Sequence, residues 1–114
     1  MTDCLFCKIL RGDIPSTKVY EDELTYAFRD INPQAPVHVL VIPKMHMASI
    51  AECDKAEDQL LAACLRTCQK VAQLEGLTEK GFRVVSNCGD DACQSVHHLH
   101  FHVLGGRKMT DSIA

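Results

Sequence analysis

The sequence has no tryptophan, and only 5 % of its 114 residues are aromatic. It lacks a long apolar run, because the longest one, Val37 to Pro43, is interrupted by His38 and is far shorter than the ~20 residues of a membrane-spanning helix. The N-terminal residues include an early acid and no apolar segment ending in small residues, so we expect no secretory signal. The Gly-x-x-x-x-Gly-Lys-Ser/Thr phosphate loop is also missing. These absences argue against a membrane partner and against ATP-driven motor chemistry.

An excess of positive charge is missing too, since 12 lysines and arginines stand against 15 acids, for a net charge of −3. A protein that binds DNA or RNA needs a basic patch, so we expect no nucleic acid polymer as a partner. A single nucleotide needs only a few local groups and stays possible. The 46 % of hydrophobic and 24 % of charged residues are typical of a globular protein. We therefore expect one domain over residues 1–114 with one core.

Cysteine is abundant, with seven residues, and the number is odd. Together with the expected lack of an export signal, this predicts free thiols, metal ligands or core residues in a reducing cytoplasm, rather than a disulfide framework. Cys64 and Cys68 lie four residues apart on an apolar helical stripe, so we expect both in the core.

Hydrophobic periodicity and turn residues predict an α+β fold around a mostly antiparallel sheet. We expect Asp3 and Asp54 to cap the two helices at their N-termini and Gly12 and Gly76 to follow their ends. The expected order is a short helix at 3–11, strands at 18–21, 24–29 and 37–42, a long helix at about 55–75, and strands at 81–86 and 96–104.

Four of the six histidines crowd into the last predicted strand. Side chains alternate between the two faces of a strand, so His98, His100 and His102 should share one face and leave the other to the core. Leu99, Phe101 and Val103, with His97, should occupy that other face. Neighbouring histidines of the three should lie about 7 Å apart and the outer pair about 13 Å apart. A single metal cannot readily bind all three at bond lengths near 2 Å, so we expect a division of labour.

Imidazole suits attack at phosphorus, because a large share is neutral at pH 7. It can form a phosphorus–nitrogen adduct that water later cleaves. A neighbouring imidazole can stabilise phosphoryl charge or protonate the leaving group. A row of histidines therefore supplies a nucleophile and its helper with one residue type.

The segment Gln94 to Arg107 (QSVHHLHFHVLGGR) resembles the histidine triad signature, His-x-His-x-His-x-x. Four further segments in the expected order are also similar to this family: Cys4 to Ile9, Gly12 to Pro15, Phe28 to His38 and Val41 to His46. The short chain and the Leu-Gly-Gly-Arg ending resemble the nucleotide-binding branch of the family.

This resemblance implies a five-stranded antiparallel sheet with one long and one short helix. It implies a homodimer with a continuous ten-stranded sheet. It also implies a hydrolase that cleaves purine nucleoside phosphoramidates, releases the nucleoside 5′-phosphate, and uses no organic cofactor. His100 would be the nucleophile on the α-phosphate and form a covalent nucleotidyl-histidine. His102 would hold phosphate oxygens, and His38 would orient its neighbours, with His98 completing the triad.

The same resemblance assigns the nucleotide contacts. Asp30 would accept both ribose hydroxyls, as a carboxylate can, although a turn-capping role is the simpler interpretation of this residue alone. Ile31 and Phe28 would flank the base, or simply belong to the core. Asn87, Gln94 and Ser95 would contact the phosphates.

The Cys4-x-x-Cys7 pair is half of a structural zinc site, or alternatively two core thiols in a helical turn. The resemblance supplies the two other ligands, His46 and His98. A Cys2His2 zinc site has no open position, so its role would be structural.

One residue and one terminal segment depart from the family pattern. Cys93 stands where glycine is usual before Gln-Ser, which could restrict the backbone or leave an oxidisable thiol. Residues 109–114 replace a tryptophan-containing ending that helps to form the pocket in eukaryotic members. Both changes bear on specificity.

Other functions stay open at this point. The triad could hold a catalytic metal, or the chain could bind nucleotides without turnover. A dinucleoside polyphosphate hydrolase or a nucleotidyltransferase of the same family would use the same residues.

Overall fold

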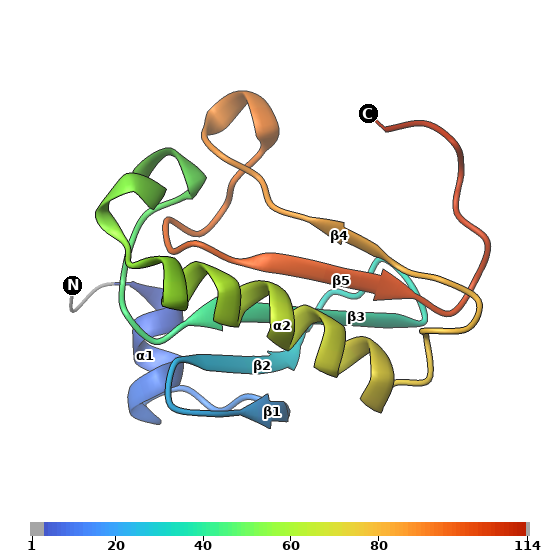
Figure 1. Ribbon diagram of the computed structural model, residues 1–114, viewed down its shortest axis with the longest axis horizontal. Coiled ribbons are helices and arrows are strands. Elements are labelled where there is room, and N and C mark those ends of the chain that lie inside the picture. The colour runs from blue at the N-terminus through green and yellow to red at the C-terminus, as the bar shows by residue number, and fades with distance from the viewer. Residues whose placement is uncertain (1–3, 114) are drawn as a thin grey trace.

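The computed structural model describes residues 4–113, which form a five-stranded antiparallel sheet with a long helix on one face (Figure 1). The strand order is β1-β2-β3-β5-β4, so β1 and β4 are the edges. The strands are β1 (Lys18–Glu21), β2 (Thr25–Arg29), β3 (Val37–Pro43), β4 (Arg83–Val85) and β5 (Phe101–Gly105). The helices are α1 (Leu5–Arg11) and α2 (Asp58–Leu74), with 3-10 turns at Ile50–Lys55 and Asp90–Ala92.

Alternation along the central strands separates two apolar clusters. Val39 and Val41 of β3 pack with Val103 of β5 and with Cys68 and Val71 of α2. The next residues along β3, Leu40 and Ile42, point to the opposite face and pack with Phe6 of α1. The sheet is therefore covered by α2 on one face and by α1 at one end of the other.

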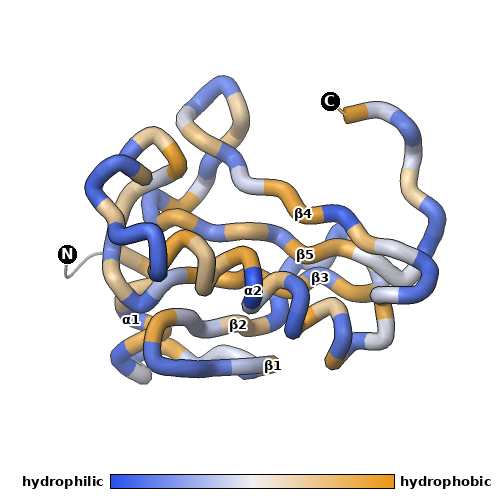
Figure 2. Tube along the Cα trace, in the orientation of Figure 1, coloured by the Kyte–Doolittle hydropathy of each residue, from blue (hydrophilic) through white to orange (hydrophobic). Residues whose placement is uncertain are grey.

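The hydropathy pattern agrees with this arrangement, since apolar and polar segments alternate along α2 (Figure 2). Cys64 and Cys68 are core residues, as predicted, and burial raises the pKa of their thiols to about 11 and about 12. No helix in the described part of the chain combines the length and apolarity needed to cross a membrane.

The α+β prediction is confirmed, and the first three strands match within one residue. The long helix differs, because residues 50–55 form a separate 3-10 turn capped by the Ser49 hydroxyl. Asp54 lies inside that turn, and Glu57 precedes α2 instead. Asp3 lies outside the described residues; Cys4 is the residue before α1, and its thiol accepts the Cys7 N–H.

The last strand is shorter than predicted, starting at Phe101 rather than residue 96. The Leu99 N–H donates to Met47 O at 2.7 Å, and the Gln94 amide donates to Ala48 O and Val96 O. Met47 O and the Gln94 side chain thus bond the Leu99 N–H and Val96 O, two backbone groups that a longer strand would have paired. Likewise β4 covers only Arg83–Val85 of the predicted 81–86.

Candidate functional site

The histidines gather on the face of the sheet that α1 partly covers. His38 and Leu40 of β3 share this face, and His102 of β5 lies opposite Leu40 in the register. His100 comes just before β5, and the Phe6 ring contacts it edge-on at a centroid distance of 5.1 Å. The three triad histidines do not stand in an open row, because His98 and His100 are buried.

A pocket of about 330 Å³ opens between α1, the end of β2 and the triad. Its size falls in the range of small-ligand sites. Six of the eight residues predicted to contact a nucleotide line it: Phe28, Asp30, Ile31, Ser95, His100 and His102. Phe6, Ile9, Leu40 and Val96 supply apolar walls. Ile31 is 91 % exposed, so it offers an apolar surface at the rim.

Asn87 and Gln94 do not line this pocket. The Gln94 amide is fully engaged in structural bonds, since its Oε1 accepts from Gly89 N–H and its Nε2 donates to two backbone carbonyls. The Asp30 carboxylate both caps a turn, with Oδ1 accepting the Asn32 N–H at 2.8 Å, and faces the pocket.

The backbone determines the tautomer of His100. Its Nδ1 lies 2.7 Å from His98 O, and a carbonyl can only accept, so Nδ1 carries the proton. Burial lowers the pKa of His100, so the ring is neutral at pH 7. Its Nε2 therefore presents a lone pair, as a nucleophile must.

The backbone also determines the tautomers of the second pair. The Gln34 N–H donates to His38 Nδ1 at 3.0 Å, so the neutral His38 ring carries its proton on Nε2. That proton is donated to His102 Nδ1 at 2.8 Å, with the Asp30 carboxylate 3.4 Å from the same His38 nitrogen. His102 consequently carries its own proton on Nε2, a buried atom without a hydrogen-bond partner among the described residues.

Both rings of this pair are neutral at pH 7. Burial lowers the pKa of His38 and lowers that of His102 to about 4, the latter with help from the neighbouring His100 and His38. Since His100 and His102 line the same pocket, one ligand would face a ring with a lone pair on Nε2 and a ring with a proton on Nε2.

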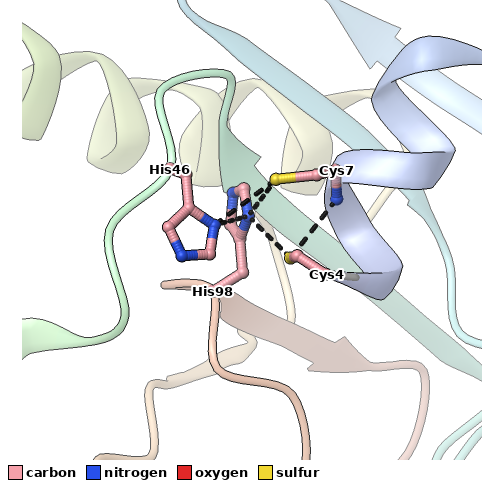
Figure 3. A group of neighbouring side chains, drawn as sticks. All are labelled: Cys4, Cys7, His46 and His98. Carbon is pink, nitrogen blue, oxygen red and sulfur yellow. Dashed lines mark hydrogen bonds between the residues drawn. The ribbon is translucent and has the colours of Figure 1, made fainter. Parts of the chain in front are cut away.

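Figure 3 shows a second cluster, in which Cys4 and Cys7 from the start of α1 meet His46 and His98. The His46 and His98 Nδ1 atoms are 3.2 Å apart, and three sulfur–nitrogen distances are 3.4, 3.4 and 3.6 Å. Tetrahedral zinc, with bonds near 2.3 Å to sulfur and 2.05 Å to nitrogen, requires about 3.3 Å between nitrogens and about 3.6 Å between sulfur and nitrogen.

The tautomer of His98 suits this cluster as well. Its Nε2 lies 2.9 Å from Pro43 O and therefore carries the proton, which leaves the Nδ1 lone pair directed at the cysteines. The four predicted ligands thus fit one tetrahedral ion in donor type and in the four distances given above, and His98 fits it in tautomer as well.

Sequence reasoning missed two contributors. Phe6 packs edge-on against both His98 and His100, but an aromatic residue in a short helix carries no signal beyond core packing. The Gln34 N–H that fixes His38 is a backbone group, so no side-chain pattern could have predicted it.

Comparison with known proteins agrees with these features. The profile described as HIT domain matches residues 11–109. A 14 kDa zinc-binding protein of Zea mays is 50 % identical over 107 residues, covering 92 % of this chain and 83 % of the maize protein. Purine nucleoside phosphoramidase of Escherichia coli (strain K12) is 39 % identical over 112 residues, covering 98 % and 94 %. A HIT family hydrolase from Clostridium thermocellum superposes with a TM-score of 0.96 at 47 % identity, covering 100 % of this chain and 99 % of that one.

Proposed function

Since the chain belongs to the HIT domain family of hydrolases, we propose that it cleaves purine nucleoside phosphoramidates, releasing the nucleoside 5′-phosphate and an amine. The observation that supports this most directly is the pair of opposite tautomers in one pocket. His100 offers a lone pair on Nε2, and His102 offers a proton on Nε2. A phosphoryl group needs both, one to attack phosphorus and one to stabilise its oxygens.

In the first step, the His100 Nε2 lone pair forms a bond to the α-phosphorus as the bond from phosphorus to the amine nitrogen breaks. The electron pair of that bond leaves with the amine, which takes up a proton from solvent. His102 donates its Nε2–H to a phosphoryl oxygen, and the charge on that oxygen raises the pKa of the imidazole toward protonation. In the second step, water attacks the same phosphorus and releases a proton to solvent as the bond to Nε2 breaks, which restores the Nε2 lone pair of His100.

The apolar walls and the rim residues suit a nucleoside. Ile31 loses water contact when a base covers it, and Phe28 lies at the pocket wall. Asp30 has lone pairs left for ribose hydroxyls after capping its turn. Ser95 is exposed at the pocket and is the phosphate contact that we retain, because the Gln94 amide is engaged and Asn87 lies outside the lining.

We further propose that zinc occupies the Cys4, Cys7, His46 and His98 cluster and has a structural role. Bound there, zinc would supply a four-ligand cross-link between α1, the segment after β3 and the segment before β5, with no ligand position open for substrate. A catalytic metal on the remaining histidines is disfavoured at His38, because its Nδ1 lone pair accepts the Gln34 N–H and its Nε2 therefore carries the proton.

The edge strand β4 suggests how two copies associate. Val84 is 38 % exposed on this edge, and antiparallel pairing of β4 with its copy would yield a ten-stranded sheet. We propose this homodimer, and a reducing cytoplasm as the compartment because all seven cysteines are free.

The test is a substrate profile at equal concentrations of adenosine 5′-phosphoramidate, cytidine 5′-phosphoramidate and diadenosine triphosphate. We expect the highest kcat/KM for the adenosine phosphoramidate and its loss in His100→Ala, with AMP binding retained. Faster cleavage of the dinucleotide would instead favour a polyphosphate hydrolase. AMP binding without turnover of any substrate would indicate a binding module.

A further inference from the structure

A second cavity, of about 460 Å³, lies away from the histidines, where the end of α2, the approach to β4 and the segment after β5 meet (Figure 1). Lys80, Arg107 and Lys108 line it. A smaller adjoining cavity, of about 230 Å³, shares these three residues and adds Arg83. Four cationic side chains therefore surround one continuous concave region.

These four cations differ from most others in the chain. Arg11, Lys18, Arg29, Lys44 and Lys55 each form an ion pair with a carboxylate. Within residues 4–113, no carboxylate lies within 4.0 Å of the cationic nitrogens of Lys80, Arg83, Arg107 or Lys108. One acid, Asp111, also lines the smaller cavity. A chain with a net charge of −3 thus keeps an unneutralised positive cluster at one place. Mutual repulsion of these charges would be relieved by a bound anion.

The two arginines are held in place by backbone carbonyls, not by acids. Arg107 donates to Gln34 O at 3.0 Å and to Lys108 O at 3.3 Å, and Arg83 donates to Thr110 O at 2.9 Å. A carbonyl fixes a guanidinium without cancelling its charge. Each guanidinium has five N–H donors, so further donors are left for a ligand. Fixing the side chains in advance also reduces the entropy lost on binding.

We propose that this region is a binding site for an oligophosphate chain, separate from the nucleotide pocket. Guanidinium groups match phosphate oxygens in pairs, and lysine ammonium groups add point charges. Because the cations are spread over two adjoining cavities, several linked phosphates fit the region better than one. The ligand is either free inorganic oligophosphate or the phosphate chain of a nucleotide.

The test is calorimetric titration with inorganic tripolyphosphate and, separately, with ATP, in protein saturated with AMP to keep the nucleotide pocket filled. We compare wild type with Lys80→Ala/Lys108→Ala and with Arg66→Ala/Lys70→Ala. The second variant makes the same charge change on exposed residues of α2. We expect binding to weaken at least tenfold in the first variant only, and to weaken with added salt.

Each outcome decides the proposal. Tripolyphosphate binding that depends on Lys80 and Lys108 supports a site for free oligophosphate, and binding of ATP alone with the same dependence assigns the site to a nucleotide. Equal weakening in both variants would show that the loss of affinity depends only on net charge, and it would overturn the proposal. The proposal is also overturned if neither tripolyphosphate nor ATP binds. Failure of AMP to bind would count against the proposed function alone, because the same titrations of the same variants without AMP decide the oligophosphate proposal by the same criteria.

Discussion

Replacing Cys93 by glycine should stabilise the protein. Cys93 has φ 60° and ψ 38°, and it is the one non-glycine residue with positive φ among residues 4–113. The left-handed conformation costs such a residue about 1–2 kcal/mol. Glycine removes that cost but loses about 0.5–1 kcal/mol through its greater freedom in the unfolded chain. Because Cys93 is exposed, loss of its thiol removes little buried surface.

The net gain for Cys93→Gly is therefore about 0.75 kcal/mol, the midpoint of that difference. For a chain of 114 residues this raises Tm by about 3 °C. Differential scanning calorimetry under reducing conditions measures it. Cys93→Ala is the matched control, since alanine also lacks the thiol but keeps the strained backbone. An equal rise in Tm for alanine, or no rise for glycine, would refute the assignment of strain to this position.

Three further predictions follow from other parts of the molecule. Chelation of zinc from the cysteine–histidine cluster should lower Tm by roughly 15 °C, because free zinc at 1000 times its Kd adds about 4 kcal/mol to the free energy of unfolding. The prediction is contradicted if a chelator leaves the calorimetric Tm of zinc-loaded protein unchanged. It is also contradicted if the chelator lowers the Tm of His46→Ala as much as that of wild type. Burial lowers the pKa of His102 from 6.5 to about 4, so the unfolded state binds more protons between these pH values. The contribution of His102 to the free energy of unfolding should thus be full above pH 6.5 and fall by up to about 3 kcal/mol toward pH 4. Urea unfolding across this pH range should show a shallower fall in stability for His102→Asn than for wild type. An equally steep fall in both proteins would contradict this prediction. Gly105→Ala should cost about 1–3 kcal/mol, because its Cβ would lie 2.8 Å from both δ-carbons of Leu77; urea unfolding should show a smaller cost in a Leu77→Ala background, and equal costs would exclude this clash.

The sequence was informative where local pattern determines structure. The β-branched run of β3 and the apolar stripe of α2 predicted two central elements, and alternation placed His100 and His102 on the side of the sheet away from α2. The Cys4-x-x-Cys7 spacing predicted a thiol pair, and the family resemblance brought His46 and His98 to it.

Contacts between distant segments could not be read in the same way. The shortening of β5 depends on the Leu99 N–H bonding to Met47, 52 positions earlier in the chain, and no local pattern encodes that. The tautomer of His98 depends on Pro43 O, 55 positions earlier in the chain. The tautomers of His38 and His100 depend on nearby backbone groups, whose direction is set by the local fold and not by any side-chain pattern. Gln94 looked like a phosphate donor from its position, whereas the structure uses its amide to tie two loops together.

Intact-mass spectrometry of rapidly quenched protein tests the central claim most directly. Wild type, His100→Ala and His102→Ala are each mixed with adenosine 5′-phosphoramidate and quenched within the first turnover. The account predicts a transient gain of one adenylyl group in wild type, none in His100→Ala, and slower formation in His102→Ala. Release of AMP with no adduct at any time, abolished by a chelator in protein that stays folded, would contradict covalent catalysis by His100 and favour a catalytic metal.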